Sequence, residues 1–124
     1  MNPLIRALVV AASLIVAPLA LAAELSGKWT SSFESQVGTQ TYTFEFKVQG
    51  GALTGTAKSN LLGDNTLESG KVDGNKVAFV EKAKYQGMDL TITYTGEVVG
   101  NDEIHFKRDV AGFGMEDMVA KRSK

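Results

Sequence analysis

Short stretches in which hydrophobic and polar residues alternate run through most of the chain, and they constrain its fold more than any other feature. The clearest covers residues 41–48, where Tyr42, Phe44, Phe46 and Val48 alternate with Thr41, Thr43, Glu45 and Lys47. Residues 88–98 repeat the pattern with Met88, Leu90, Ile92, Tyr94 and Val98 on one side. A period of two over this length is typical of a β-strand with one buried face.

Turn signals separate these stretches at fairly even spacing, and most contain glycine. They lie at Gly38, Gly50-Gly51, Gly63-Asp64-Asn65, Asp73-Gly74-Asn75, Gln86-Gly87, Gly100-Asn101-Asp102 and residues 112–114. Seven turns divide the chain into eight short segments rich in Thr, Val, Phe and Tyr. Every connection is short, which favours sequential hairpins that close into a barrel and so remove both exposed edges. We therefore predict an all-β fold, an eight-stranded antiparallel up-and-down β-barrel, with a β-sandwich as the alternative; residues 111–118 are expected to hold at most one helical turn.

The N-terminal 22 residues have the pattern of a secretory signal peptide. Arg6 provides a basic start, residues 7–21 are apolar except for Ser13 and Pro18, and Ala20-Leu21-Ala22 forms an A-x-A cleavage site. The alternative is an uncleaved membrane anchor, but the apolar stretch is short for a span of about 20 residues. We expect residues 1–22 to be removed and residues 23–124 to form a single exported barrel domain, periplasmic or extracellular, without a stable membrane anchor.

Charge and composition narrow the possible functions of this domain. The formal net charge of the chain is −1 and moves to about −2 once Arg6 is removed, so neither nucleic acid nor an anionic membrane is the expected main partner. Cysteine is absent, which excludes thiol catalysis and cysteine-based zinc sites. With a single histidine and no nucleophile–base constellation, we expect no metal, no cofactor and no enzymatic activity; His105 is expected on the solvated outer face.

Two features of the chain resemble a known group of barrels. Gly27-Lys28-Trp29 begins the first predicted strand, and Arg122 ends the last. This resembles the calycin group (lipocalins, fatty-acid-binding proteins and avidins), in which a tryptophan closes one barrel end beneath a basic side chain. The resemblance implies that Trp29 and Arg122 form such a structural closure.

Among the calycins, the avidins are the most similar in sequence over the first third of the mature chain. The segment Gly51-Ala52-Leu53-Thr54-Gly55-Thr56 matches a Gly-x-Leu-Thr-Gly-Thr stretch of that family, and Ser31 falls where avidins carry a polar ligand contact. The later biotin-stacking tryptophans have no counterpart, because Trp29 is the only tryptophan, and the second lipocalin motif and disulfide are missing. The resemblance thus implies the fold and not biotin binding. The C-terminal part, residues 106–122, is also similar to that of small exported bacterial proteins of unassigned function.

An up-and-down barrel predicts which end binds a ligand. Trp29 and Arg122 lie at the same end, the bottom, where the three turns are tight. Residues 34–39, 60–65, 84–87 and 109–116 meet at the opposite end, the top, and are expected to form longer loops, which commonly carry binding residues. Alternation directs a set of side chains into the barrel near this top end: Phe33, Tyr42, Phe44, Ser59, Tyr85, Met88 and Leu90.

Two charged residues fall on otherwise apolar strand faces. Glu81 follows Val77 and Phe79 in the inward pattern, and Arg108 follows Ile104 and Phe106. An unpaired buried charge is very costly, so we expect Glu81 and Arg108 to pair with each other or to contact a ligand.

Two functions remain open on the sequence. In the first, the protein binds a small apolar or aromatic molecule at the open barrel end, through Phe33, Tyr42, Phe44, Glu81, Tyr85 and Arg108. In the second, the barrel is filled by its own side chains, has no small-molecule ligand, and acts as a structural or interaction protein through its surface or top loops.

Overall fold

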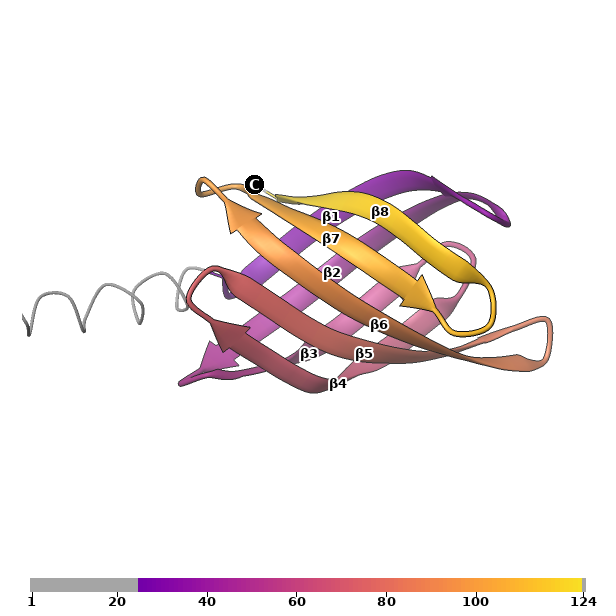
Figure 1. Ribbon diagram of the computed structural model, residues 1–124, viewed down its shortest axis with the longest axis horizontal. Helices are drawn as coiled ribbons and strands as arrows, with labels where there is room; N and C mark the ends of the chain where they lie inside the picture. Colours follow the sequence, from indigo (N-terminus) through magenta and orange to yellow (C-terminus); the bar gives the residue numbers. More distant parts are fainter. Residues whose placement is uncertain (1–24, 124) are drawn as a thin grey trace, which may run out of the picture.

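The computed structural model describes residues 25–123 and consists of eight antiparallel strands in a closed barrel (Figure 1). Each strand pairs with its neighbour in sequence, and β1 pairs with β8 to close the barrel. The predicted up-and-down barrel is therefore confirmed, and the sandwich alternative is wrong. The predicted signal peptide lies outside the described residues. The strands are β1 (Gly27–Ser35), β2 (Gly38–Gln49), β3 (Ala52–Ser59), β4 (Gly63–Asp73), β5 (Lys76–Tyr85), β6 (Met88–Val99), β7 (Glu103–Val110) and β8 (Gly114–Arg122).

The connections between strands are tight at both ends of the barrel. The top hairpins turn at residues 36–37, 60–62, 86–87 and 111–113, and the bottom ones at residues 50–51, 74–75 and 100–102. The expectation of longer top loops is thus wrong, because the strand pairing continues almost to the tip of each hairpin. The helical turn expected within residues 111–118 is also wrong: β8 begins at Gly114, and its residues pair with β7.

The alternating pattern places side chains as predicted on the longer strands. On β2, Tyr42, Phe44 and Phe46 are buried while Thr41, Glu45 and Lys47 are exposed. The lower and middle parts of the interior are filled by packed aromatic rings, whose centroids lie 4.5–6.1 Å apart: Phe44, Phe46, Phe79, Tyr94 and Phe106. Each such buried side chain contributes about 1.5–3 kcal/mol to stability, more than an exposed ion pair such as Lys107–Asp117 can provide.

The pairing of β4 is irregular with both of its neighbours. The register shifts between Leu53 and Thr56 on β3, and again between Glu68 and Lys71 on β4. A β-carbon built on Gly70 would lie 2.0 Å from the carbonyl oxygen of Leu53, so only glycine permits this close approach of the two backbones.

Candidate functional site

At the bottom of the barrel, Trp29 on the first strand lies beneath Arg122 at the end of the last strand. Trp29 is fully buried and donates a hydrogen bond from Nε1 to the carbonyl oxygen of Leu25, 3.0 Å away. The guanidinium carbon of Arg122 lies 4.4 Å from the centre of the Trp29 ring, the arrangement that the resemblance to the calycins implies. This cation–π contact covers the tryptophan ring, and Trp29 lines neither of the two hollows described below.

A layer of buried polar side chains lies above the aromatic core. Glu81 on β5 is 0% exposed and Arg108 on β7 is 1% exposed. No direct ion pair within 4 Å joins them among residues 25–123; two tyrosine hydroxyls lie between them instead. Arg108 donates from Nη2 to the hydroxyl of Tyr42 (2.8 Å) and from Nε to that of Tyr94 (3.0 Å). The same hydroxyls lie 3.0 and 2.7 Å from Oε1 of Glu81, so the expected pairing is indirect.

The direction of the protons in this layer follows from the charges. Arginine can only donate and an ionised carboxylate can only accept, so each tyrosine accepts from Arg108 and donates to Glu81. Asn65 adds a donor to Oε2 of Glu81 at 2.8 Å. The carboxylate therefore has three donors, enough to offset a large part of its loss of hydration.

Burial keeps both phenols protonated. It is the main cause that raises the pKa of Tyr42 and of Tyr94 well above the usual value near 10, and the neighbouring Glu81 carboxylate raises both further, while Arg108 opposes the shift. For Arg108, burial disfavours the charge, but the oxygens of Tyr94, Tyr42 and Glu116 outweigh it and raise the pKa. Arg108 is thus a permanently charged donor.

Arg108 also makes contacts toward the top of the barrel. Its Nη1 donates to Oε1 of Glu116 on β8 at 2.6 Å, and the Glu116 side chain is only 10% exposed. Its guanidinium carbon lies 5.2 Å from the ring centres of Phe33 and Tyr42, and 5.6 Å from that of Tyr94. Three rings and three hydrogen bonds hold this side chain in one position.

A cavity of about 160 Å³ lies directly above Arg108 at the top end. Most of its lining is apolar, and every top hairpin contributes to it. The lining residues are Ser35, Gln36, Val37, Gln40, Leu62, Tyr85, Gln86, Met88, Leu90, Ile92, Arg108, Val110, Phe113 and Glu116.

The cavity contains two of the residues predicted from the sequence to bind a ligand. Tyr85 and Arg108 line it, and so do Met88 and Leu90, which alternation had directed toward this end. Phe33 and Tyr42 lie beside Arg108 and line a different hollow, described below. Phe44 lies within the aromatic core, and Glu81 is buried in the polar layer; neither lines a described cavity.

The sequence reasoning missed Gln40 and Glu116. Gln40 is 2% exposed, lines the cavity, and its Oε1 has no hydrogen-bond partner. It continues the inward series of Tyr42, Phe44 and Phe46 by one step, so the period of two could have placed it inside. Glu116 was missed because residues 111–118 were expected to hold a helical turn, so the alternating pattern of a strand was not applied to them.

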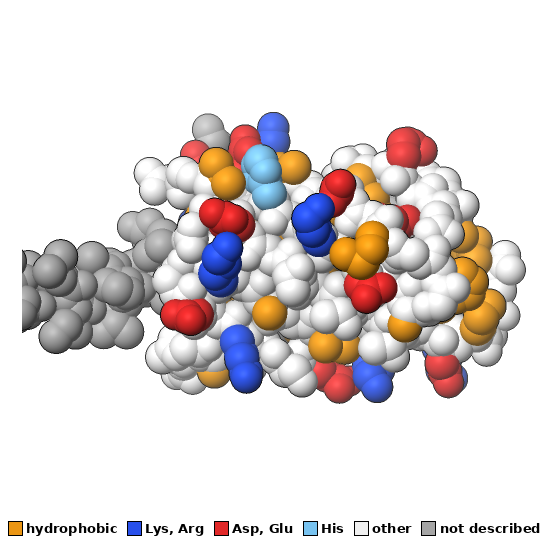
Figure 2. Space-filling view, in the orientation of Figure 1, with side chains coloured by type: hydrophobic (Ala, Val, Ile, Leu, Met, Phe, Trp, Pro, Cys, Tyr) orange, Lys and Arg blue, Asp and Glu red, His pale blue; other side chains and the backbone are white. Residues whose placement is uncertain are grey.

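The cavity opens into an apolar rim. Val37 and Phe113 on two hairpin tips are 44% and 48% exposed, and Met88 at the start of β6 is 48% exposed. With Leu61, which is 36% exposed, each top hairpin contributes one large apolar side chain. Figure 2 shows hydrophobic side chains gathered at this end, on the right, whereas charged residues of both signs are spread over the strand surface.

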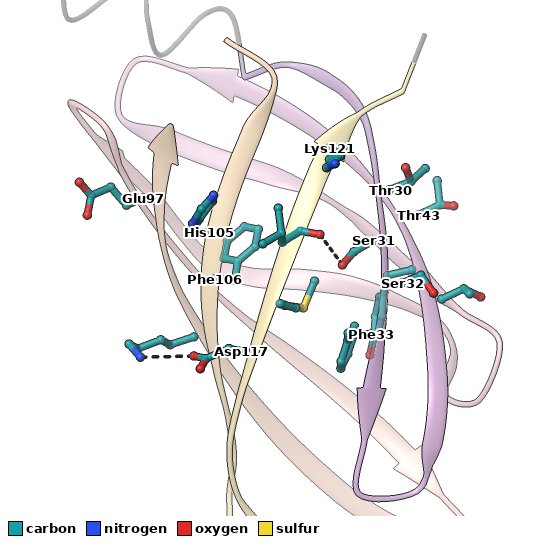
Figure 3. Close-up of a pocket in the computed structure, with 15 residues that line it drawn as sticks. Thr30, Ser31, Ser32, Phe33, Thr43, Glu97, His105, Phe106, Asp117 and Lys121 are labelled. Carbon is teal, nitrogen blue, oxygen red and sulfur yellow. Dashed lines mark hydrogen bonds and ion pairs between the residues drawn. The ribbon is translucent and has the colours of Figure 1, made fainter. Parts of the chain in front are cut away.

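A larger hollow of about 960 Å³ lies where β1 and β8 separate. These strands share only two register pairs, Trp29 with Arg122 and Thr30 with Lys121, whereas β1 and β2 share nine. Above this point the hydroxyl of Ser31 on β1 donates a hydrogen bond to the carbonyl oxygen of Val119 on β8, 2.7 Å away (Figure 3). Much of the lining consists of outward polar residues such as Ser32, Thr43, His105 and Lys121. The hollow is therefore the open side of a seam, less enclosed than the top cavity despite its volume.

Comparison with protein-family models, curated proteins and solved structures yields no match for this chain. The structure thus supports a closed eight-stranded barrel, while membership of the calycin group stays a prediction. In residues 25–123 no helix is long and apolar enough to cross a membrane. The same part of the chain has no group of three His, Cys, Asp or Glu side chains that could hold a metal ion.

Proposed function

We propose that this protein is a small exported barrel that binds an apolar or aromatic small molecule in the cavity at its top end. The observation that carries the proposal is the cavity itself: about 160 Å³, apolar in most of its lining, open at an apolar rim and floored by a fixed charged group. An apolar cavity of about 150 Å³ in another protein is enough to bind benzene. A single ring or a short alkyl chain is therefore the size of ligand that fits.

The size of the cavity also limits the affinity. A ligand of six to eight heavy atoms rarely gains more than about 1 kcal/mol per atom, so dissociation constants from about 1 mM to 1 μM are expected. Residues 1–22 would direct the protein out of the cytoplasm. The exported protein would then meet such a ligand in the periplasm or the medium.

Native mass spectrometry of the mature protein, purified from an exporting host and then extracted with solvent, tests the proposal. An additional mass that leaves on denaturation is expected, as is uptake of single-ring compounds by the extracted protein. Val110→Phe fills the cavity and should abolish uptake, whereas Val99→Phe makes the same change at an exposed position on the outside and should preserve it. A bare polypeptide that takes up no compound would refute the proposal.

The apolar rim also favours a second candidate, a barrel that binds another protein through its top hairpins. Exposed apolar side chains on four neighbouring hairpins are typical of contact surfaces. The double change Met88→Ser with Phe113→Ser should then abolish a partner interaction while Val110→Phe leaves it intact. If the filled-cavity variant and the rim variant lose the same interaction, the surface and the cavity are one site, and this second candidate fails.

A further inference from the structure

The polar groups at the base of the top cavity specify a chemical class of ligand. Arg108 has five N–H donors, and three hydrogen bonds from it are accounted for, to Tyr42, Tyr94 and Glu116. Two donors remain on a side chain that lines the cavity and is 1% exposed. A bound molecule with an acceptor atom is the natural partner for them.

Gln40 supplies the complementary group. Its Oε1 is buried without a partner, and the side chain lines the same cavity. The other buried side-chain atom without a partner in residues 25–123, Oγ1 of Thr56, lies beside the irregular pairing of β3 and β4. Gln40 thus presents an acceptor that a donor on a ligand in this cavity would satisfy.

The charges around the cavity disfavour an anion. Glu81 and Glu116 place two carboxylates in the polar layer, and Arg108 contacts Glu116 directly and Glu81 through the tyrosine hydroxyls. An anionic head group would add a third negative charge beside an arginine already shared by two carboxylates. An ammonium group would satisfy Gln40 but could not accept from Arg108.

Resting on the function proposed above, we propose that the ligand is a neutral single-ring or short-chain molecule with one hydroxyl or primary amide group, which donates to Gln40 and accepts from Arg108. The apolar part then lies against Leu62, Leu90 and Ile92, and extends toward Phe113 at the rim. Gln40 and Arg108 line the same cavity of about 160 Å³, so a ligand that fills it meets both side chains.

Calorimetric titration of the extracted protein with phenol, benzamide, toluene and benzoate at pH 7 tests this assignment. Phenol and benzamide should bind about tenfold more tightly than toluene, since two hydrogen bonds distinguish them, and benzoate should bind more weakly than phenol. In Gln40→Met the advantage of phenol over toluene should shrink several-fold. Gln49→Met, the same change at an exposed position on the same strand, should preserve it.

The ligand-free protein provides a second readout. Gln40→Met removes a buried acceptor without a partner, so the melting temperature of the ligand-free barrel should rise by about 4 °C or more. A fall in melting temperature would show that Gln40 is a structural residue and would overturn its assignment to the ligand.

The outcomes separate this inference from the proposed function. Equal affinity for toluene and phenol would overturn the head-group assignment and leave an apolar binding barrel standing. Tightest binding of benzoate would overturn the charge argument. Failure of all four compounds to bind, together with a bare mass for the purified protein, would overturn both proposals.

Discussion

Replacing Arg108 with methionine tests whether the buried layer is one coupled network. Methionine keeps most of the length of the side chain but removes the charge and all three hydrogen bonds, to Tyr42, Tyr94 and Glu116. The Glu81 carboxylate, 0% exposed, is then left without a cation in its network. Breaking a buried charged network by removing one member costs about 3–5 kcal/mol, a large part of the 5–15 kcal/mol that stabilises a typical domain.

The partner change should cost less, and the two costs should not add. Glu81→Gln leaves Arg108 charged but still paired with Glu116, so a loss of about 1–3 kcal/mol is expected. In the double variant position 81 carries no charge, so the loss of Arg108 leaves no buried carboxylate there without its cation. The loss of the carboxylate likewise leaves no guanidinium without a partner, because Arg108 is also absent. The sum of the single losses should therefore exceed the double loss by about 1–3 kcal/mol, the range seen for groups in one network.

Urea unfolding followed by tryptophan fluorescence measures these losses directly, because Trp29 is the only tryptophan and is fully buried. Lys107→Met is the matched control on the neighbouring outward position, where the Lys107–Asp117 pair is exposed and the change should cost no more than about 0.5 kcal/mol. Additive losses, or an Arg108→Met loss no larger than that of the control, would refute the network. If Arg108→Met alone does not fold but the double variant does, the coupling is demonstrated by that difference.

Three further measurements test other parts of the structure. The raised pKa values keep Tyr42 and Tyr94 protonated in the folded barrel, whereas the unfolded chain loses these two protons above about pH 10. The free energy of unfolding should therefore fall above that pH by up to about 2.7 kcal/mol per pH unit. Tyr42→Phe should roughly halve this slope in urea titrations, and an unchanged slope would contradict the assignment. Ser31→Ala removes the hydrogen bond to Val119 and should cost about 1 kcal/mol of stability. Amide hydrogen exchange should become faster in β1 above Thr30 but not in β5 and β6, and Ser32→Ala at the neighbouring exposed position is the control. Uniform exchange across the barrel would show that the seam is not a separate weak point. Gly96→Ala would place a β-carbon 2.5 Å from the Phe106 ring, so calorimetry should show a loss of about 1–3 kcal/mol, and a neutral result would mean that the ring moves aside freely.

The fold could be predicted from the sequence because each level of the sequence pointed to the same answer. Alternation on β2 and β6 predicted most of the buried side chains, although Met88 at the start of β6 is 48% exposed, and the glycine-containing turns predicted the number of strands. The wrong predictions concern residues 111–118 and the lengths of the top loops, where the local sequence pattern gives little information. Residues 111–118 contain two glycines and two methionines and show no clear alternation, yet pairing with β7 makes most of them a strand. The lengths of the top loops depend on how far pairing continues, which only the whole barrel determines.

The candidate site could be predicted only in part, because a period of two says which face a residue occupies but not what it meets across the barrel. Glu81 and Arg108 were recognised as buried charges on that basis. The two hydroxyls that separate them come from β2 and β6, and their distance from each charge depends on the shear of the closed barrel. The partial pairing of β1 with β8 was likewise hidden, since no feature of either strand shows where their ladder ends.

The polar layer explains how a small barrel can combine a filled core with a binding cavity. Its members come from six strands: Tyr42 on β2, Asn65 on β4, Glu81 on β5, Tyr94 on β6, Arg108 on β7 and Glu116 on β8. Glu116 also ties the layer to the hairpin between β1 and β2, because its Oε2 accepts from the backbone N–H of Gln36 at 3.0 Å. Rigid-body motion of any one of these strands would break a charged hydrogen bond, so the floor of the cavity stays fixed even where β1 and β8 share few backbone bonds. A fixed floor below an apolar mouth lowers the cost of ordering a ligand's head group, which is the condition under which so small a cavity could be selective.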